Sequence, residues 1–412
     1  MKLLYLIPGA LLVAITVWLF WITGKPRRME ALDRGLQEQL NHLLPTNSGE
    51  GNLITTYTDL EELLDTLKSD VTNAKDHVHM EFFKFEDDAT GRQLAEVMAM
   101  RAESGVEVRL LYDDFVCRHW HRLYRDLRSH GVEAVGYNPL HWPVPIKKDY
   151  YRNHRKVVVI DGSIAYIGGM NIADRYVHGL DWGCWRDTMI RVEGPSAALA
   201  QHIFLTDWRY STKQVSLSTK YFPTVPVAGT SPLRLITSGP IGDGPTIMHY
   251  TAGLLHRAKR YAWFESPYFI PTDEIQEAMF GAAQRGVDVR LLLPPCGDQG
   301  EGTQLASKSY FARAMKAGVR IGIYQPGYMH SKIIVCDDTI AVVGSCNIDP
   351  RSHLLCQEVA AVIENSEYAH KLKEVFLADE SVSTYIDPAE WANRPCKQRI
   401  AETLMHQVAS LL

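Results

Sequence analysis

The sequence has little of what builds a disulfide framework, a zinc site or a nucleic-acid surface. Its seven cysteines are odd in number and none form a Cys-x-x-Cys pair, which argues against the first two and fits a reducing compartment. The net charge of −5 gives the chain no general attraction to nucleic acid. The 46% apolar and 22% charged residues still indicate a globular protein. Its 412 residues suffice for two domains or one large duplicated domain.

One long apolar run without charge, Leu3 to Thr23, lies near the amino end. Its length matches the roughly 20 residues that a helix needs to cross a bilayer. Three basic residues follow the run and one precedes it, which favours a cytoplasmic carboxyl side. The alternative is a cleaved signal peptide, but the run is too long and no small-x-small site precedes the basic residues. We therefore predict a single transmembrane anchor with a basic flank over residues 1–28.

The rest of the chain is predicted to contain two similar halves. The segment Gly105–Leu111 (GVEVRLL) matches Gly286–Leu292 (GVDVRLL), and each follows a helical stretch. Alternating strands and helices indicate an α/β fold, with each repeat a mixed, mostly parallel sheet flanked by helices. The predicted segments are an amphipathic linker helix over 29–50, a first repeat over 51–210, a connector over 211–232, a second repeat over 233–364 and a helical tail over 365–412.

The two halves also carry the same polar motif. His154, Lys156 and Asp161 surround an apolar run in the first half, and His330, Lys332 and Asp337 do so in the second. Asn171 and Asn347 each follow their histidine at the same offset of 17 residues. A lone histidine before a strand is usually a cap or a surface residue. Two copies of the set in one register instead indicate a composite active site.

Local geometry explains the spacing within each motif. The apolar run Val157–Ile160 predicts a buried strand, Asp161-Gly162 a tight turn, and Ile164–Ile167 an antiparallel return strand. This hairpin would bring Asn171 beside His154, and a turn at Asp337-Asp338 would do the same in the second half. Asp161 and Asp337 complete the motifs and are counted with the candidate catalytic residues. Their place at the turn end nevertheless predicts a structural role, with no part in proton transfer.

The paired motifs predict phosphodiester chemistry without a metal ion or cofactor. Lysine and asparagine suit phosphate oxygens, and a histidine can act as nucleophile or general acid near neutral pH. Joining the two sets by a pseudo-twofold axis supplies one histidine to attack phosphorus and one to protonate the leaving oxygen. The intermediate would be a covalent phosphohistidine. By symmetry, either histidine could take either role.

These residues resemble the signature of the phospholipase D superfamily, the HKD motif. Several flanking blocks resemble bacterial cardiolipin synthases, and the resemblance covers most of residues 50–412. The blocks are Trp185–Asp187, Glu193–Pro195, Asp207-Trp208, Glu265–Thr272, Asn347–Ser352 and Glu358. The resemblance implies that His154 attacks, that His330 protonates, and that Glu358 and Asp187 orient the histidines. It also implies a phosphate-site role for Ser345 in the Gly-Ser-x-Asn block, where the first half has Gly169 instead.

The function implied by this resemblance is phosphatidyl transfer at a bacterial inner membrane. Two phosphatidylglycerol molecules would give cardiolipin and glycerol. The partners expected are this anionic phospholipid and the membrane, without nucleic acid. The basic segment Trp142–Arg155, with Lys147, Lys148, Arg152 and Arg155, suits an anionic headgroup, although an ordinary solvated loop explains it equally.

Two other functions stay open at this point. One is hydrolysis of phospholipid, or less readily of nucleic acid, by the same site with water as acceptor. The other is a membrane scaffold with a degenerate site, which the intact His, Lys and Asn sets disfavour.

Overall fold

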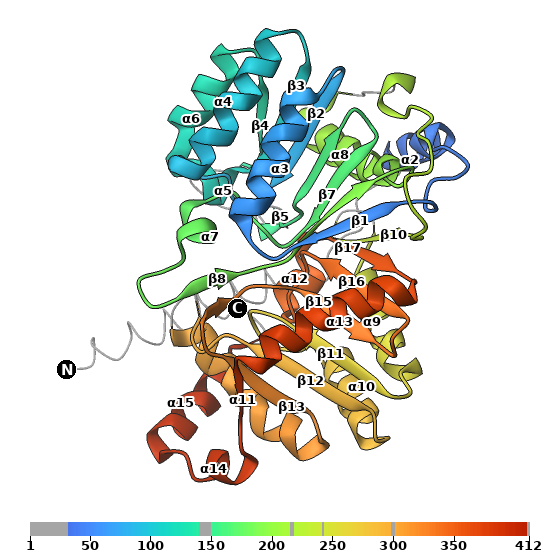
Figure 1. Cartoon of the computed structure of the whole chain (residues 1–412). Helices are drawn as coiled ribbons and strands as arrows, with labels where there is room; N and C mark the ends of the chain where they lie inside the picture. Colours follow the sequence, from blue (N-terminus) through green and yellow to red (C-terminus); the bar gives the residue numbers. More distant parts are fainter. Residues whose placement is uncertain (1–31, 140–149, 215–217, 241–242, 298–300, 410–412) are drawn as a thin grey trace, which may run out of the picture.

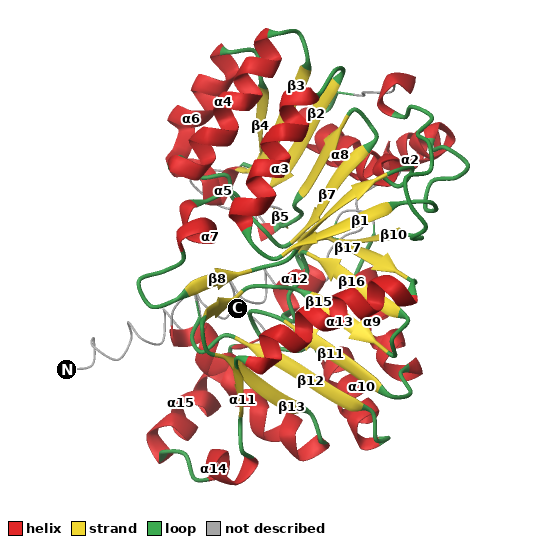
Figure 2. Ribbon diagram, viewed as in Figure 1, coloured by secondary structure: helices red, strands yellow, loops and turns green. Residues whose placement is uncertain are grey.

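The computed structural model describes residues 32–139, 150–214, 218–240, 243–297 and 301–409. Two mixed sheets stand at the centre, and helices cover their outer sides (Figures 1 and 2). The helices are α2 (Leu32–Leu43), α3 (Leu60–Asn73), α4 (Ala89–Glu103), α5 (Asp114–Cys117), α6 (His121–Ser129), α7 (Asp174–His178), α8 (Ala197–Thr212), α9 (Thr246–Arg257), α10 (Asp273–Gln284), α11 (Glu301–Ala317), α12 (Pro350–Leu354), α13 (Ser366–Ser381), α14 (Pro388–Ala392) and α15 (Cys396–His406).

The two sheets repeat one strand order. The first runs β1-β9-β7-β6-β2-β3-β4 and the second runs β10-β17-β16-β15-β11-β12-β13, with β18 added at its edge. The strands of the first are β1 (Leu53–Tyr57), β2 (His77–Phe82), β3 (Glu107–Asp113), β4 (Glu133–Tyr137), β6 (Val157–Ile160), β7 (Ile164–Gly168) and β9 (Met189–Glu193). Those of the second are β10 (Arg234–Ser238), β11 (Tyr261–Glu265), β12 (Asp288–Leu293), β13 (Arg320–Tyr324), β15 (Ile333–Cys336), β16 (Ile340–Gly344), β17 (Cys356–Ile363) and β18 (Ser383–Tyr385).

The prediction of mostly parallel sheets is wrong. Only β2, β3 and β4 pair in parallel in the first sheet, as do β11, β12 and β13 in the second. Along these two strand orders all other pairings are antiparallel, and β5 (Arg152–Asn153) adds one further parallel pairing, with β17. The reason is that the crossover helices α4, α5, α6, α10 and α11 join the parallel strands, whereas β6 and β7, like β15 and β16, are joined by tight turns. The α/β class with two repeats is confirmed.

The predicted hairpins are confirmed in both halves. Val157 pairs with Ile167 across the first, and Ile333 pairs with Val343 across the second. The turn residue Asp161 has a φ of 50° and Asp337 one of 52°, in the left-handed region that aspartate tolerates in tight turns.

The inner faces of the two sheets form one buried core. Apolar side chains of β6, β7 and β9 belong to the same cluster as those of β15, β16 and β17. The side chains of these strands that point the other way pack beneath helices: α3, α4, α6 and α7 cover the first sheet, and α9, α10 and α11 the second. The two sheets therefore pack face to face, and the packed strands include β6 and β15, which directly follow the two motif histidines.

Two predicted segments outside the repeats have different outcomes. Helix α2 lies within the predicted linker helix, and Leu40 belongs to a buried cluster with Phe204 and Trp208 of α8. The predicted anchor over 1–28 lies outside the described residues. Within the described part of the chain, no helix is long and apolar enough to cross a membrane.

Candidate active site

Each motif histidine is held by a short strand pair that joins the two repeats. Strand β5 (Arg152–Asn153) pairs in parallel with β17, and β14 (Gly327–Met329) pairs in parallel with β8 (Cys184–Arg186). The backbone hydrogen bonding continues one residue past each of these strand pairs, to the histidine itself. The His154 amide donates to the Gln357 carbonyl at 2.9 Å, and the His330 amide donates to the Arg186 carbonyl at 2.7 Å.

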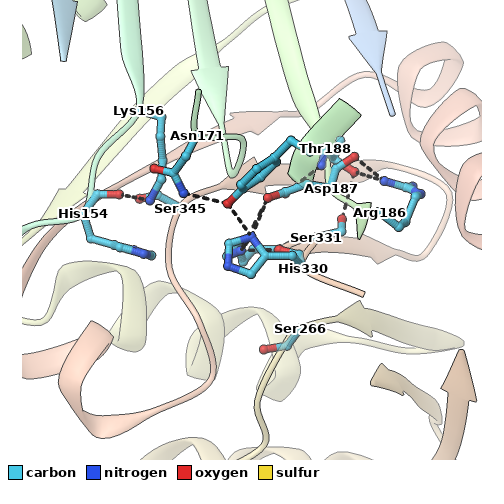
Figure 3. Close-up of polar contacts among 12 residues, drawn as sticks. His154, Lys156, Asn171, Arg186, Asp187, Thr188, Ser266, His330, Ser331 and Ser345 are labelled. Atoms are coloured by element: carbon cyan, nitrogen blue, oxygen red, sulfur yellow. Dashed lines mark hydrogen bonds and ion pairs between the residues drawn. The ribbon is translucent and has the colours of Figure 1, made fainter. Parts of the chain in front are cut away.

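The residue after each acceptor carbonyl is an acid, so each histidine meets a carboxylate of the other repeat. His154 Nδ1 lies 2.9 Å from Glu358 Oε1, and His330 Nδ1 lies 2.5 Å from Asp187 Oδ2 (Figure 3 shows the second pair). A carboxylate on Nδ1 fixes the tautomer that leaves Nε2 for chemistry. The two half-sites are thus completed reciprocally, across the interface between the repeats.

Glu358 is itself held by a hydroxyl. Ser345 Oγ donates to Glu358 Oε2, and Ser345 is fully buried. Ser345 therefore lies behind the carboxylate, which corrects the expectation of a phosphate-site role. The hydroxyl fixes the orientation of Glu358, which in turn orients His154.

Asp187, the counterpart of Glu358, has no serine hydroxyl in the position equivalent to Ser345. The first repeat has Gly169 where the second has Ser345, and a Cβ added at Gly169 would overlap the Asp187 carboxylate. Asp187 Oδ1 instead accepts a backbone hydrogen bond from Thr188 at 2.7 Å, and the Thr188 hydroxyl lies 2.8 Å from Ser331 Oγ (Figure 3). Glycine is thus required at position 169 because the carboxylate approaches so closely.

We expect Gly169→Ala to lower kcat about 100-fold, because the new methyl group pushes Asp187 away from His330. Gly281→Ala in α10 is the matched control, since its Cβ would meet only the flexible end of Arg285. Turnover and the thermal midpoint are measured for both variants. A fully active Gly169→Ala protein would contradict the close packing of Asp187.

The electrostatic surroundings of the two histidines also differ. Burial lowers the pKa of His154 well below its ordinary value, and the nearby ammonium groups of Lys156, Lys332 and Lys84 lower it further. His154 is therefore neutral at physiological pH, as a nucleophile must be. Burial also raises the pKa of Glu358 to about 7 and lowers the pKa of Lys156 to about 7.

Aromatic rings surround His330. The ring centroids of Trp185, Tyr176 and Tyr328 lie 5.2, 5.9 and 5.9 Å from that of His330. Among the described residues, His154 has one corresponding ring contact, with Phe83 at 4.7 Å. The Asp187 carboxylate favours a cation on His330, which suits the protonated form of an acid catalyst, and Lys332 Nζ also lies 2.7 Å from His330 Nδ1.

The motif lysines bind the backbone of their own histidines, whereas the two motif asparagines differ in their hydrogen-bond partners. Lys156 Nζ donates to the His154 carbonyl at 2.5 Å, and Lys332 Nζ makes the equivalent bond to the His330 carbonyl. Asn171 Nδ2 donates to the Tyr176 hydroxyl at 2.7 Å, and that hydroxyl lies 3.4 Å from His330 Nδ1. Asn171 thus reaches the histidine of the other repeat, through a tyrosine that sequence reasoning missed.

Asn347 has an acceptor without a partner. Its Oδ1 is buried and makes no hydrogen bond with the described residues, although Asn347 lines the same small cavity as Lys332. A buried amide oxygen without a partner is costly, so a hydroxyl donor from a substrate would satisfy it.

Asp161 and Asp337 are not brought to the histidines. Asp161 accepts hydrogen bonds from the backbone amides of Lys75, Asp76 and His77, each at 2.8 to 3.0 Å. Asp337 accepts equivalent bonds from the amides at positions 259–261. Each carboxylate ties a hairpin turn to the start of the neighbouring parallel strand, β2 or β11.

Two of the four basic residues assigned to a headgroup surface are buried in ion pairs. Arg152 Nη1 lies 3.1 Å from Asp113 Oδ1, and Arg155 Nη1 lies 2.6 Å from Asp207 Oδ2. Arg155 also donates to the Glu358 carbonyl at 3.1 Å. Neither side chain is available to a lipid, which corrects that expectation. Lys147 and Lys148 lie outside the described residues.

Comparisons with known proteins point to one family. The family model described as "Cardiolipin synthase, PLD-like domain" matches residues 67–208 and 252–380. A cardiolipin synthase of Geobacillus kaustophilus is 36% identical over 86% of this chain and 71% of its own length. Cardiolipin synthase 2 of Bacillus anthracis is 35% identical, over 87% and 70%, and a cardiolipin synthase of Staphylococcus aureus is 34% identical, over 91% and 77%.

Two solved structures share the fold. The crystal structure of phosphatidylserine synthase from Haemophilus influenzae superposes with a TM-score of 0.67 at 14% identity, over 92% of this chain and 98% of the other. Polyphosphate kinase from Porphyromonas gingivalis has a TM-score of 0.56 at 13% identity, over 89% and 52%. At these identities the likeness concerns the fold alone.

Proposed function

Because this chain belongs to the cardiolipin synthase family of phospholipase D-like proteins, we propose that it joins two phosphatidylglycerol molecules into cardiolipin and glycerol. The observation that carries the proposal is the reciprocal pairing of His154 with Glu358 and of His330 with Asp187. It gives two histidines whose Nε2 atoms are both left for chemistry, in different electrostatic surroundings.

The first step transfers the phosphatidyl group to the protein. His154 Nε2 attacks phosphorus while the bond from phosphorus to the glycerol headgroup oxygen breaks. His330 donates its Nε2 proton to that oxygen, so glycerol leaves as a neutral alcohol and a phosphatidyl-His154 intermediate remains. The ammonium groups of Lys156 and Lys332 stabilise the charge that develops on the other phosphate oxygens.

The second step reverses these roles with a new alcohol. A headgroup hydroxyl of the second phosphatidylglycerol gives its proton to the now neutral His330 and attacks phosphorus. The bond from phosphorus to His154 breaks, and cardiolipin is released with both histidines in their initial states. The assignment of roles rests mainly on His154, which burial and three ammonium groups keep neutral. At His330 Nδ1 the Asp187 carboxylate lies 2.5 Å away and favours the protonated form, with Lys332 Nζ at 2.7 Å from the same atom.

Phosphatidylglycerol resides in a bilayer, so the chain must work there. We include in the proposal the membrane anchor predicted over residues 1–28, with the catalytic repeats on the cytoplasmic side of a bacterial inner membrane. The uncharged run Leu3–Thr23 and the basic residues that follow it support this placement.

Product analysis tests the proposed reaction. The full chain is reconstituted in vesicles with phosphatidylglycerol that carries one label in an acyl chain and another in the headgroup glycerol. We expect labelled cardiolipin and free glycerol in equal amounts. Phosphatidic acid without cardiolipin would show hydrolysis in place of transfer.

The pH dependence follows from two neighbouring groups with pKa values of about 7. Glu358 must be ionised to accept the Nδ1 proton of His154, so kcat/KM should fall as the pH drops below about 7. Lys156 must be protonated to stabilise the phosphate, so kcat/KM should also fall above about 7. A rate profile over pH 5 to 10 should be bell-shaped, and Lys156→Arg should lose the alkaline limb. A profile that is flat between pH 6 and 9 would contradict these assignments.

A further inference from the structure

Three large apolar side chains are exposed on segments that neighbour the strands and rings around the catalytic histidines. Phe115, Trp182 and Leu354 are 37%, 47% and 41% exposed. Single exposed apolar residues are common and need no explanation. These three differ in two ways. They come from segments that are far apart in the sequence, and each segment neighbours a strand or ring that is next to a catalytic histidine.

Phe115 and Leu354 both border the strand pair next to His154. The Arg152 guanidinium lies 6.0 Å from the Phe115 ring centroid, and Arg152 is two residues before His154. Arg152 also pairs with Cys356 in the β5–β17 ladder, and Leu354 is two residues before Cys356. Phe115 thus follows β3 and Leu354 precedes β17, and β5 contacts both of these strands.

Trp182 lies on the side of His330. It belongs to the loop between α7 and β8, and its ring centroid is 6.4 Å from that of Tyr328. The Tyr328 ring is in turn 5.9 Å from His330. Figure 1 shows α5, α7 and this loop along the same side of the molecule, where the two repeats meet.

Positive charge accompanies this surface. The segment Phe115–Arg125 lies between Asp114 and Asp126 and contains no acidic residue itself. Its three arginines, Arg118, Arg122 and Arg125, are all exposed. Arg118 stacks on the Phe115 ring at 4.9 Å, so a cation and an aromatic side chain are presented together.

We propose that Phe115, Trp182 and Leu354, with the exposed arginines of Phe115–Arg125, form a docking surface that enters the headgroup layer of an anionic phospholipid bilayer. Aromatic rings favour that layer, and each basic residue near an anionic surface adds attraction. The surface brings both histidines to the lipid headgroups. This inference rests on the proposed function for its substrate but concerns residues outside the reacting groups.

The kinetic test compares one substrate class in two physical states. The full chain is held in phosphatidylcholine nanodiscs. It receives either long-chain phosphatidylglycerol in the disc or dihexanoyl-phosphatidylglycerol dissolved as monomers. The variant Phe115→Ser/Trp182→Ser/Leu354→Ser should lose about 100-fold on the bilayer substrate, because three apolar contacts with lipid are lost, and keep its rate on the dissolved one. Val227→Ser, at a 66% exposed position in the connector, should leave both rates unchanged.

Equal rates of variant and wild type on both substrates would overturn the docking surface, and so would equal losses on both. A wild type that turns over neither substrate would contradict the proposed function instead. In that case a second measurement, which needs no catalysis, tests whether the docking surface enters the bilayer. Brominated phosphatidylglycerol should quench fluorescence that is present in wild type and absent in Trp182→Phe. If the fluorescence of Trp182 is not quenched, this surface does not enter the bilayer.

Discussion

Replacing His154 with alanine should lower cardiolipin synthesis about 10⁴-fold, because no other group can form the covalent intermediate. The same loss should occur with a phosphatidyl donor that carries a p-nitrophenol leaving group. His154 is needed to attack phosphorus whatever group departs, so a better leaving group cannot replace it. Release of nitrophenol measured by absorbance checks both statements.

His330→Ala is the matched comparison for this variant. It should be as inactive as His154→Ala on phosphatidylglycerol, because the glycerol oxygen needs a proton as it leaves. With the p-nitrophenol donor it should release one equivalent of nitrophenol per protein, since that leaving group needs no acid. Rescue of His154→Ala in place of His330→Ala would exchange the two roles.

The second large loss of activity should come from replacing Asp187 or Glu358, the carboxylates that each contact the histidine of the other repeat. Asp187→Asn should cost about 10³-fold on phosphatidylglycerol, because the amide cannot stabilise the imidazolium form of His330. Glu358→Gln should cost a similar factor by leaving His154 in the wrong tautomer. Both substitutions preserve shape, so circular dichroism and thermal midpoints should stay close to wild type.

Activity on the p-nitrophenol donor should distinguish the role of Asp187 from that of Glu358. Asp187, in the first repeat, serves the histidine of the second, so Asp187→Asn should recover with the p-nitrophenol donor as His330→Ala does. Glu358→Gln should not recover. If each acid served the histidine of its own repeat, the pattern would be reversed.

The hairpins could be predicted from the sequence because their determinants are local. The continuous apolar run Val157–Ile160 and a turn residue such as Asp161, able to adopt a positive φ, fix the register within a few residues. The same geometry predicted that Asp161 lies away from the reacting atoms, and its carboxylate does bind backbone amides near β2.

The contacts between the repeats could not be predicted in this way. Strands β5 and β14 have two and three residues, too few to show a period, and their partners are far away in the chain. The role of Ser345 also depends on this long-range pairing, because Glu358 reaches His154 only when β17 lies beside β5. The resemblance to a family supplied the identity of the acids, while the structure supplied which histidine each one serves.

The basic segment before the first motif shows how charge alone misleads. Local composition alone predicts that Arg152 and Arg155 bind lipid headgroups. Their partners, Asp113 and Asp207, come from other elements, so the sequence gives no local sign that both guanidinium groups are buried. Burial of such pairs is tolerated because each charge is matched.

Rapid-quench mass spectrometry can locate the covalent intermediate directly. The full chain is mixed with phosphatidylglycerol in vesicles, quenched in alkali to preserve a phosphohistidine, and digested. We predict a phosphatidyl group on the peptide that contains His154, and none on the peptide that contains His330. An adduct on His330, or cardiolipin formed within the first turnover without any adduct, would contradict the proposed mechanism.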